Sequence, residues 1–158
     1  MRKTGIKRWE KTKREEVKEG RMELPFAEDI GHYWQTGSSA PDTWIEKAKR
    51  QIEEVGGIIN ADAYGAMGNQ AAFMITFSIG NDIFKVVFPV LESKTGKSMS
   101  AKRQAATMLY HDIKAKCMVA SVMGAKAAFF SYLMLPDGRT ASEVATPELA
   151  QNFPLLLK

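Results

Sequence analysis

Thr95-Gly96-Lys97-Ser98 is the stretch whose residue types point most directly to chemistry, because the same tetrapeptide ends many phosphate-binding loops. Such a loop needs another glycine five residues before the glycine of Gly-Lys-Ser, since its backbone must curl around the phosphates. That position is Leu91 in this chain. The spacing therefore excludes a nucleotide-hydrolysing loop. It leaves a flexible, lysine-bearing loop that leads into a helix start, where free N–H groups favour an anion.

Basic side chains continue from this loop along the segment that follows it. Ser93–Lys116 contains six Lys or Arg and one Asp. Cations on a loop and helix can follow a phosphate backbone, and neighbouring aromatic rings can stack on bases, so we predict a surface that binds single-stranded nucleic acid without catalysis. An ordinary solvated helix face is the alternative interpretation. The predicted binding residues are Lys94, Lys97, Lys102, Arg103, Lys114, Lys116, Lys85 and Tyr110, with His111 and Tyr64 as further stacking candidates.

Two of these lysines have special positions in the pattern. Lys116 falls near the apolar side of its helix, beside Leu109 and Ile113, so it either snorkels at the edge of that side or points into a groove. Lys85 alternates with Phe84 and Val86, which places it on the sheet face opposite the predicted core. Lys85 would therefore extend the positive surface from another element.

Asp82, Glu92 and Lys94 support a second, enzymatic interpretation. Glu92-Ser93-Lys94 with an earlier Asp resembles the D…ExK metal site of restriction-type and junction-resolving nucleases, in which two carboxylates hold a divalent cation and a lysine positions the water. That family places its Asp near the start of the second strand, where this chain has Asn69-Gln70. A metal-dependent nuclease is therefore the alternative function, and a solvated charge pair is the non-functional interpretation.

Composition narrows the possible classes further. The net charge is +4, and Met1–Arg21 alone holds nine Lys or Arg against four Glu, as expected of a polyanion binder. One cysteine and two histidines give too few ligands for a structural zinc site or a disulfide framework, and we predict no metal and no cofactor. The longest apolar runs fall well short of a membrane span, and no signal peptide precedes them. We expect a cytoplasmic protein that contacts no membrane.

The elements that must position these residues follow from hydrophobic periodicity and turn residues. Apolar residues recur at helical spacing in the first segment, where Thr43 to Glu46 fits a capping box, and alternate along three later strands. The fold class is α+β: a helix, a three-stranded antiparallel meander, a long helix and a C-terminal helical extension. The predicted ranges are Thr43–Val55, Ile58–Tyr64, Ala72–Ile79, Ile83–Leu91 and, capped by Ser100, a helix from Ser100 to at least Met123.

The long helix is predicted to be amphipathic, with Leu109, Ile113 and Met123 on its apolar side and Arg103 and Thr107 on its polar side. The following segment, Ala127–Leu135, is apolar all round and is predicted to be helical because Ala-Lys-Ala-Ala has poor strand propensity. A short helix is expected from Thr146. The apolar residues Phe153–Leu157 would pack on the core or on a neighbouring copy.

The distribution of charged and apolar residues along the chain also predicts its domain organisation. Residues 1–41 are predicted to form a flexible basic arm and an irregular linker, in which Phe26, Ile30, Tyr33 and Trp34 lie against the domain. Residues 42–158 are predicted to form one α+β nucleic-acid-binding domain. Nine methionines and aromatic residues in the tails fit contacts between subunits, and we expect a homo-oligomer.

Ala101-Lys102-Arg103-Gln104-Ala105-Ala106 opens the long helix and Ala120-Ser121-Val122-Met123-Gly124 closes it. With the order helix, three-stranded meander, long helix, this pattern resembles the ring-forming single-strand annealing proteins of phages and of eukaryotic recombination, over roughly Thr43–Gly124. The resemblance implies ATP-independent annealing of complementary strands, homo-oligomeric rings or filaments, and a basic groove lined by the meander and the long helix. Double-stranded RNA-binding domains share the element order, but their last helix is usually much shorter.

Overall fold

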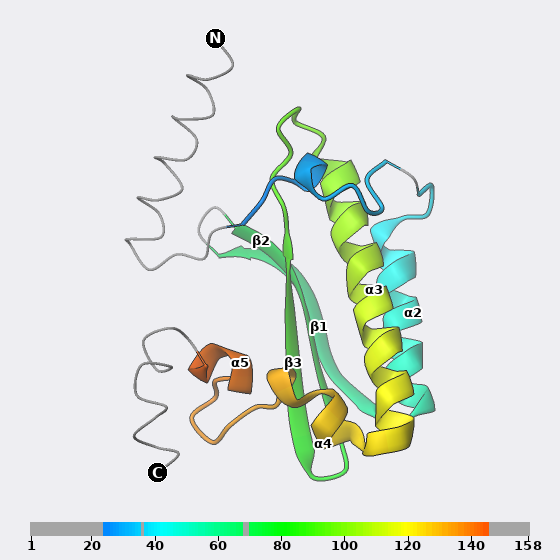
Figure 1. Ribbon diagram of the computed structural model, residues 1–158, viewed down its shortest axis with the longest axis vertical. Coiled ribbons are helices and arrows are strands. Elements are labelled where there is room, and N and C mark those ends of the chain that lie inside the picture. Colours follow the sequence, from blue (N-terminus) through cyan, green and yellow to red (C-terminus); the bar gives the residue numbers. More distant parts are fainter. Residues whose placement is uncertain (1–23, 36, 68–69, 146–158) are drawn as a thin grey trace.

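The computed structural model describes residues 24–35, 37–67 and 70–145. Within them the chain forms an α+β domain in which two helices lie side by side over one face of a three-stranded sheet (Figure 1), so the predicted fold class and element order are confirmed. The elements are η1 (Ala27–Asp29), α2 (Pro41–Glu54), β1 (Ile58–Met67), β2 (Gln70–Ile79), β3 (Asp82–Val90), α3 (Ser98–Met123), α4 (Ala125–Ala128), η2 (Phe130–Tyr132) and α5 (Ala141–Val144).

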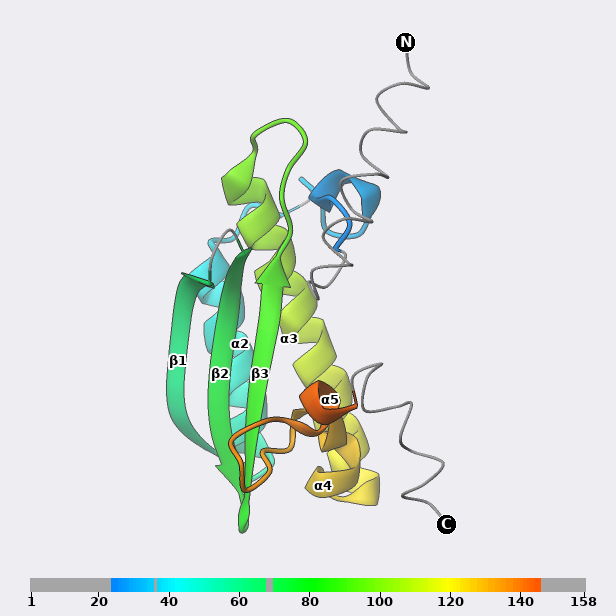
Figure 2. The same cartoon turned by 90° about the vertical axis from the view of Figure 1, so that its left-hand side faces the viewer.

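The sheet has the strand order β1-β2-β3, and both neighbouring pairs are antiparallel. Figure 2 shows the three strands side by side with α2 and α3 together behind them. Phe73, Ile75 and Phe77 of β2 are buried beneath the helices while the residues between them are less so, as the alternating sequence predicts. Phe77 pairs with Phe84 across β2 and β3, with ring centroids 5.3 Å apart. The core therefore lies between the sheet and the two helices.

Both long helices start earlier than the sequence pattern predicts. The first residue of α2 is Pro41, whose fixed φ suits that position, and the cap is Ala40, so the predicted capping box at Thr43 is wrong. The long helix α3 begins at Ser98 with Lys97 as its cap, which also corrects the cap predicted at Ser100. Its 26 residues give a rod roughly 39 Å long that spans the whole domain.

The chain after α3 is not the continuous helix predicted over Ala127–Leu135. Gly124 ends α3 with a φ of +91°, and only the short α4 and η2 follow. Phe129, fully buried, meets Phe77 edge-on at 5.2 Å between ring centroids. The chain then extends along β3, where the Met134 N–H donates to the Ile83 carbonyl at 2.8 Å. Burial of Phe129 in the core turns the chain back to the sheet edge, which an uninterrupted helix could not do.

Residues 24–35 and 37–40, predicted as part of a linker, lie along the N-terminal half of α3. Gln104 is buried, and its Nε2 group lies 3.0, 2.9 and 3.1 Å from the carbonyl oxygens of Ala27, Ile30 and His32. The Ala27 N–H donates to the Glu92 carbonyl at 2.8 Å, and Ala27 is fully buried. This segment therefore packs as part of the domain. The predicted arm at 1–23 and the predicted elements beyond residue 145 lie outside the described residues.

None of the helices in the described ranges combines the length and the apolar character that a membrane crossing requires.

Candidate nucleic-acid interface

The loop between β3 and α3 holds two carboxylates of its own chain. The Lys94 ammonium lies 2.6 Å from Asp29 Oδ1, and the hydrogen bond from Lys94 holds the pKa of Asp29 below its usual value. The Ser93 hydroxyl and the Thr95 N–H both donate to Glu28 Oε2, each at 3.2 Å. The loop therefore presents donor groups that can hold a carboxylate. In this structure the acidic residues of η1 occupy them.

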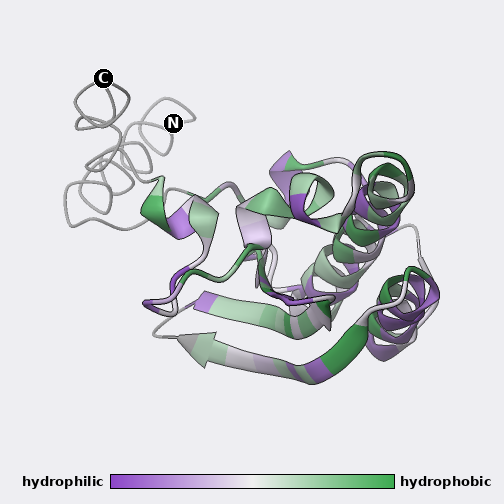
Figure 3. Ribbon diagram, turned by 90° about the horizontal axis from the view of Figure 1, so that it is seen from below, coloured by the Kyte–Doolittle hydropathy of each residue, from purple (hydrophilic) through white to green (hydrophobic). Residues whose placement is uncertain are grey.

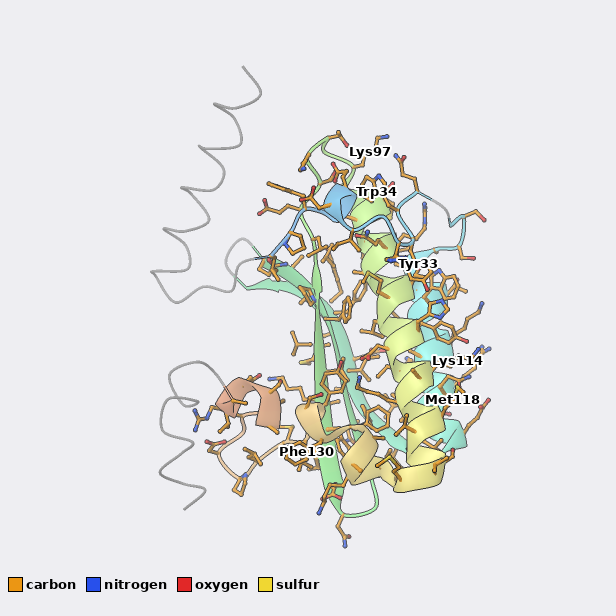
Figure 4. All side chains as sticks on the ribbon, viewed as in Figure 1. Tyr33, Trp34, Lys97, Lys114, Met118 and Phe130 are labelled. Atoms are coloured by element: carbon orange, nitrogen blue, oxygen red, sulfur yellow. The ribbon has the colours of Figure 1, made fainter. Side chains whose placement is uncertain are left out.

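Lys97 and Lys102 have different surroundings at the start of α3. Lys97 is exposed at the end of the domain (Figure 4), and no carboxylate in the described part of the chain pairs with it. Lys102 is half-buried, with its ammonium 3.9 Å from the ring centroid of Tyr64 on β1. The Tyr64 ring is 48% exposed. Tyr64 and Lys102 thus form a cation–π pair that solvent still reaches.

Arg103 holds the segment before α2 rather than facing solvent. Its Nη1 group donates to the Gly37 carbonyl at 3.0 Å, and a Cβ added at Gly37 would lie 3.4 Å from Arg103 Cδ. Thr107, one turn later, is also buried. Arg103, predicted on the polar side of α3, is therefore engaged by the segment before α2, and Met123, predicted on the apolar side, is 68% exposed.

An exposed aromatic stack lies where this covering segment meets α3. The Tyr33 and His111 rings are nearly parallel, with an interplanar angle of 7° and centroids 5.0 Å apart. The ring centroids of Trp44, on α2, and His111 are 6.1 Å apart, and the Lys47 ammonium is 4.5 Å from the Trp44 ring centroid. Lys114 follows His111 by three residues and is exposed on the same side of α3 as Tyr33 (Figure 4). We call Tyr33, Trp44, Lys47, His111 and Lys114 the basic–aromatic surface.

The backbone around Tyr33 is held in an unusual conformation. Tyr33 and Gln35 have φ values of +60° and +58°, which side chains other than glycine rarely adopt. Such residues cost on the order of 1 kcal/mol each and persist where surrounding contacts fix them. The Gln104 hydrogen bonds and the stack on His111 supply those contacts. The position of the Tyr33 ring is therefore fixed by the fold.

The remaining predicted residues lie elsewhere or have partners within the chain. Tyr110 is half-buried against Trp44, with ring centroids 5.3 Å apart. Lys116 pairs with Asp112 and lies 5.2 Å from the Tyr132 ring centroid, so it connects α3 with η2. Lys85 is directly opposite Thr76 in the register, on the sheet face away from the helices as predicted. The structure therefore does not bring Lys85 together with the lysines of α3.

The carboxylates of the alternative metal site are also separated. Asp82 is the first residue of β3 and Glu92 follows its last residue, so about ten residues of extended chain, roughly 30 Å, lie between them. Asp82 instead lies 3.6 Å from the Lys126 ammonium. Across residues 24–35, 37–67 and 70–145, no group of three His, Cys, Asp or Glu side chains could hold a metal ion. The arrangement that the nuclease interpretation requires is not assembled.

Sequence reasoning missed three of the five residues of the basic–aromatic surface. His111 and Lys114 were named in advance, but Tyr33, Trp44 and Lys47 were not assigned a binding role. The Trp44 and Lys47 pair has a signal in the sequence, because residues three apart on a helix are neighbours. The approach of Tyr33 to His111 has none, because 78 positions separate the two residues in the chain.

Comparison with models of protein families, with characterised proteins and with solved structures finds no match to this chain. The functional argument therefore rests on the sequence and the geometry of this molecule.

Proposed function

We propose that this protein binds single-stranded nucleic acid in the cytoplasm and anneals complementary strands without ATP, as a homo-oligomer in a phage-type recombination process. The observation that carries the proposal is the exposed Tyr33–His111 stack, with Lys114 three residues after His111 on α3 and Lys47 over the ring of Trp44, which lies next to His111. Aromatic rings interleaved with cations are the usual means of holding single strands without reading their sequence.

The energetics favour a local site over general charge attraction. Twelve Lys or Arg balance twelve Asp or Glu in the described residues, so this part of the chain has no net charge to attract a polyanion. Stacking of one base on an aromatic side chain contributes about 1–3 kcal/mol, and each phosphate contact adds counterion release. The basic–aromatic surface supplies both kinds of contact. Lys97, roughly 25 Å farther along α3, extends the path of a bound strand.

The annealing activity rests on two supports. The sequence lacks a nucleotide-hydrolysing loop, so strand pairing would have to proceed without ATP. The second support is the resemblance to single-strand annealing proteins, which is based on the order helix, three-stranded meander, long helix that the chain contains. Contacts made by stacking and by phosphate attraction are independent of base sequence, and they leave base edges available for a complementary strand.

The proposal is tested by titrating the protein into labelled single- and double-stranded oligonucleotides, with and without magnesium, while following binding, annealing and cleavage. We expect tighter binding to the single strand, faster annealing and no cleavage. In a Lys47→Ala/Lys114→Ala variant the slope of log K against log salt should fall by about 1.4, or about 0.7 for each lost phosphate contact.

The matched control is Lys126→Ala/Arg139→Ala, which removes two cations from α4 and from the turn before α5 and should leave the slope unchanged. Equal losses in both double variants would indicate general charge attraction and contradict a localised site. Magnesium-dependent cleavage would support the nuclease alternative instead.

A further inference from the structure

The last two turns of α3 present an apolar face to solvent. Met118, Val119, Val122 and Met123 expose 65%, 42%, 86% and 68% of their surface, and Ala115 is exposed one turn earlier. These five residues are spaced i, i+3, i+4, i+7 and i+8, which places them on one side of a helix. Figure 3 shows the lower end of α3 in hydrophobic green beside a mainly hydrophilic α2. We call these five residues the apolar stripe.

The upper part of the same helix face is covered by the chain itself. Counting back from Ala115 at helical spacing gives His111, Met108 and Gln104. Gln104 is bonded to the carbonyl groups of residues 27–32, and His111 lies under Tyr33. The face is therefore one continuous strip whose N-terminal half is packed. No other described element packs over its C-terminal half.

We propose that a second copy of this chain covers the apolar stripe through a two-fold symmetric helix pair. The four large side chains expose on the order of 500 Å², so two stripes together provide about 1,000 Å², the lower limit for a specific protein interface. A single patch that packs on itself needs only one complementary surface, which two-fold symmetry supplies.

The covered half of the face determines the direction of the pair. In a parallel arrangement the segments of residues 24–35 in the two copies would meet and hold the helices apart. An antiparallel arrangement points the covered halves away from each other and lets residues 115–123 overlap. With the two-fold axis at Val119, the small Ala115 of one copy lies opposite the long Met123 of the other. The methionine side chain then fills the space that the alanine leaves.

This symmetry also has a consequence for the basic–aromatic surface. A two-fold axis perpendicular to both helices leaves corresponding flanks of α3 on the same side of the pair. Lys114, which borders the stripe on the side of α2, would therefore face the same way in both copies (Figure 4). One strand could then contact both surfaces. This last step rests on the proposed function, whereas the dimer does not.

Sedimentation velocity of the full-length protein without nucleic acid tests the dimer. We expect the wild type to shift from monomer to dimer with increasing concentration, and Val122→Lys to raise the dissociation constant about tenfold or more. Val122 contributes nothing to the core, so at protein concentrations where both are monomeric the variant should unfold at the same urea concentration as the wild type. The matched control is Ile58→Lys, a change of the same kind at a residue that is 67% exposed on β1.

A cysteine placed on the axis tests the geometry. Oxidised Val119→Cys should form a disulfide-linked dimer, whereas Ser131→Cys, exposed on η2, should not; Cys117 is buried and does not interfere. A wild type that stays monomeric, or a dimer that Val122→Lys leaves intact, would overturn the proposal. So would a monomer whose stripe binds a hydrophobic dye only after residues 146–158 are removed, because the chain's own C-terminus would then be the cover. Oligonucleotide binding by Val122→Lys is measured separately, so that loss of the dimer and loss of the proposed function are distinguishable.

Discussion

The Lys94 ammonium lies 2.6 Å from the Asp29 carboxylate, a residue 65 positions earlier in the chain. Together with Glu28, which accepts hydrogen bonds from Ser93 and Thr95, Asp29 occupies the donor groups of this loop. A lysine that the sequence marks as free for nucleic acid is therefore already paired. A bound phosphate would have to replace the carboxylate.

Asp29→Asn should tighten binding to a single-stranded oligonucleotide. Removal of the carboxylate charge frees Lys94, and the effect of an exposed ion pair corresponds to about a two- to fivefold change in affinity. Fluorescence anisotropy of a labelled oligonucleotide measures the change. Asp137→Asn, which frees Arg139 in the turn before α5, is the control and should have no effect. Unchanged affinity for Asp29→Asn would show that the strand does not reach this loop.

The pair between Lys94 and Asp29 also sets a pH dependence. The pKa of Asp29 is lowered in the folded protein, chiefly by the hydrogen bond from Lys94. The carboxylate therefore stays charged through its ordinary titration range near 3.8, and the contribution of the pair to stability is lost only as the pH falls through the lowered pKa. Carbon-detected NMR of the Asp29 carboxyl should give a midpoint below 3.8, and Lys94→Ala should return it toward that value.

Gln104→Leu should destabilise the domain by about 2 kcal/mol, because three backbone carbonyls in the covering segment lose their shared donor. Urea unfolding followed by circular dichroism measures the free energy of unfolding. Gln51→Leu provides the comparison, since Gln51 is half-buried on α2 and makes no side-chain hydrogen bond to the described residues. A similar small change in both variants would mean that the segment is held by its apolar contacts alone.

Single substitutions of Lys97 and Arg103, two cations near the start of α3, should have different effects: the first on binding and the second on stability. Lys97→Ala should lower the salt slope of oligonucleotide binding by about 0.7 and leave stability unchanged, because Lys97 is exposed and without a partner in the described residues. Arg103→Ala should lower the urea midpoint, because the Gly37 carbonyl loses its donor. Salt titrations and urea melts of both variants check this division. An Arg103→Ala variant of unchanged stability whose binding has a reduced salt slope would instead indicate that Arg103 contacts the oligonucleotide.

Cys117 should react slowly with a thiol reagent in the folded protein. Burial raises the pKa of its thiol to about 11, so almost no thiolate is present at neutral pH. The unfolded thiol ionises near 9.0, so this group's contribution to stability is complete below pH 9 and decreases as the pH rises from 9 to 11. Reaction with dithionitrobenzoate at pH 7 in water and in urea tests the burial. Equal rates would show that the C-terminal half of α3 opens readily.

The fold could be predicted because its strands and helices have local patterns of apolar residues. Alternation in β2 and helical spacing in α2 depend only on neighbours in the sequence, so both elements follow from the residues themselves. The polarity of the α3 face could not be predicted in the same way. Arg103 is a polar residue engaged by a segment from far along the chain, Thr107 is a polar residue that is buried, and Met123 is an apolar residue that no described element covers.

In the candidate site, too, the exposure of a residue could be predicted from the sequence but its contacts with distant residues could not. Lys97 is exposed as the sequence suggests, and its binding role stays a prediction. The sequence could not predict the ion pairs of Lys94 with Asp29 and of Lys116 with Asp112, because it does not show which charged side chains meet in the fold. The stack of Tyr33 on His111 depends on a left-handed backbone at Tyr33, for which this residue type gives no indication.

The hydrogen bonds that hold residues 27–32 and Gly37 on α3 join groups 66 to 77 positions apart in the chain. Contacts of such long range form late, because the loop they close must first be ordered. In native-state hydrogen exchange we therefore expect residues 27–35 to open at lower free energy than β2 or the middle of α3. The Tyr33–His111 stack would then be among the last features to form during folding, and a chain that begins at α2 could keep its sheet while lacking it.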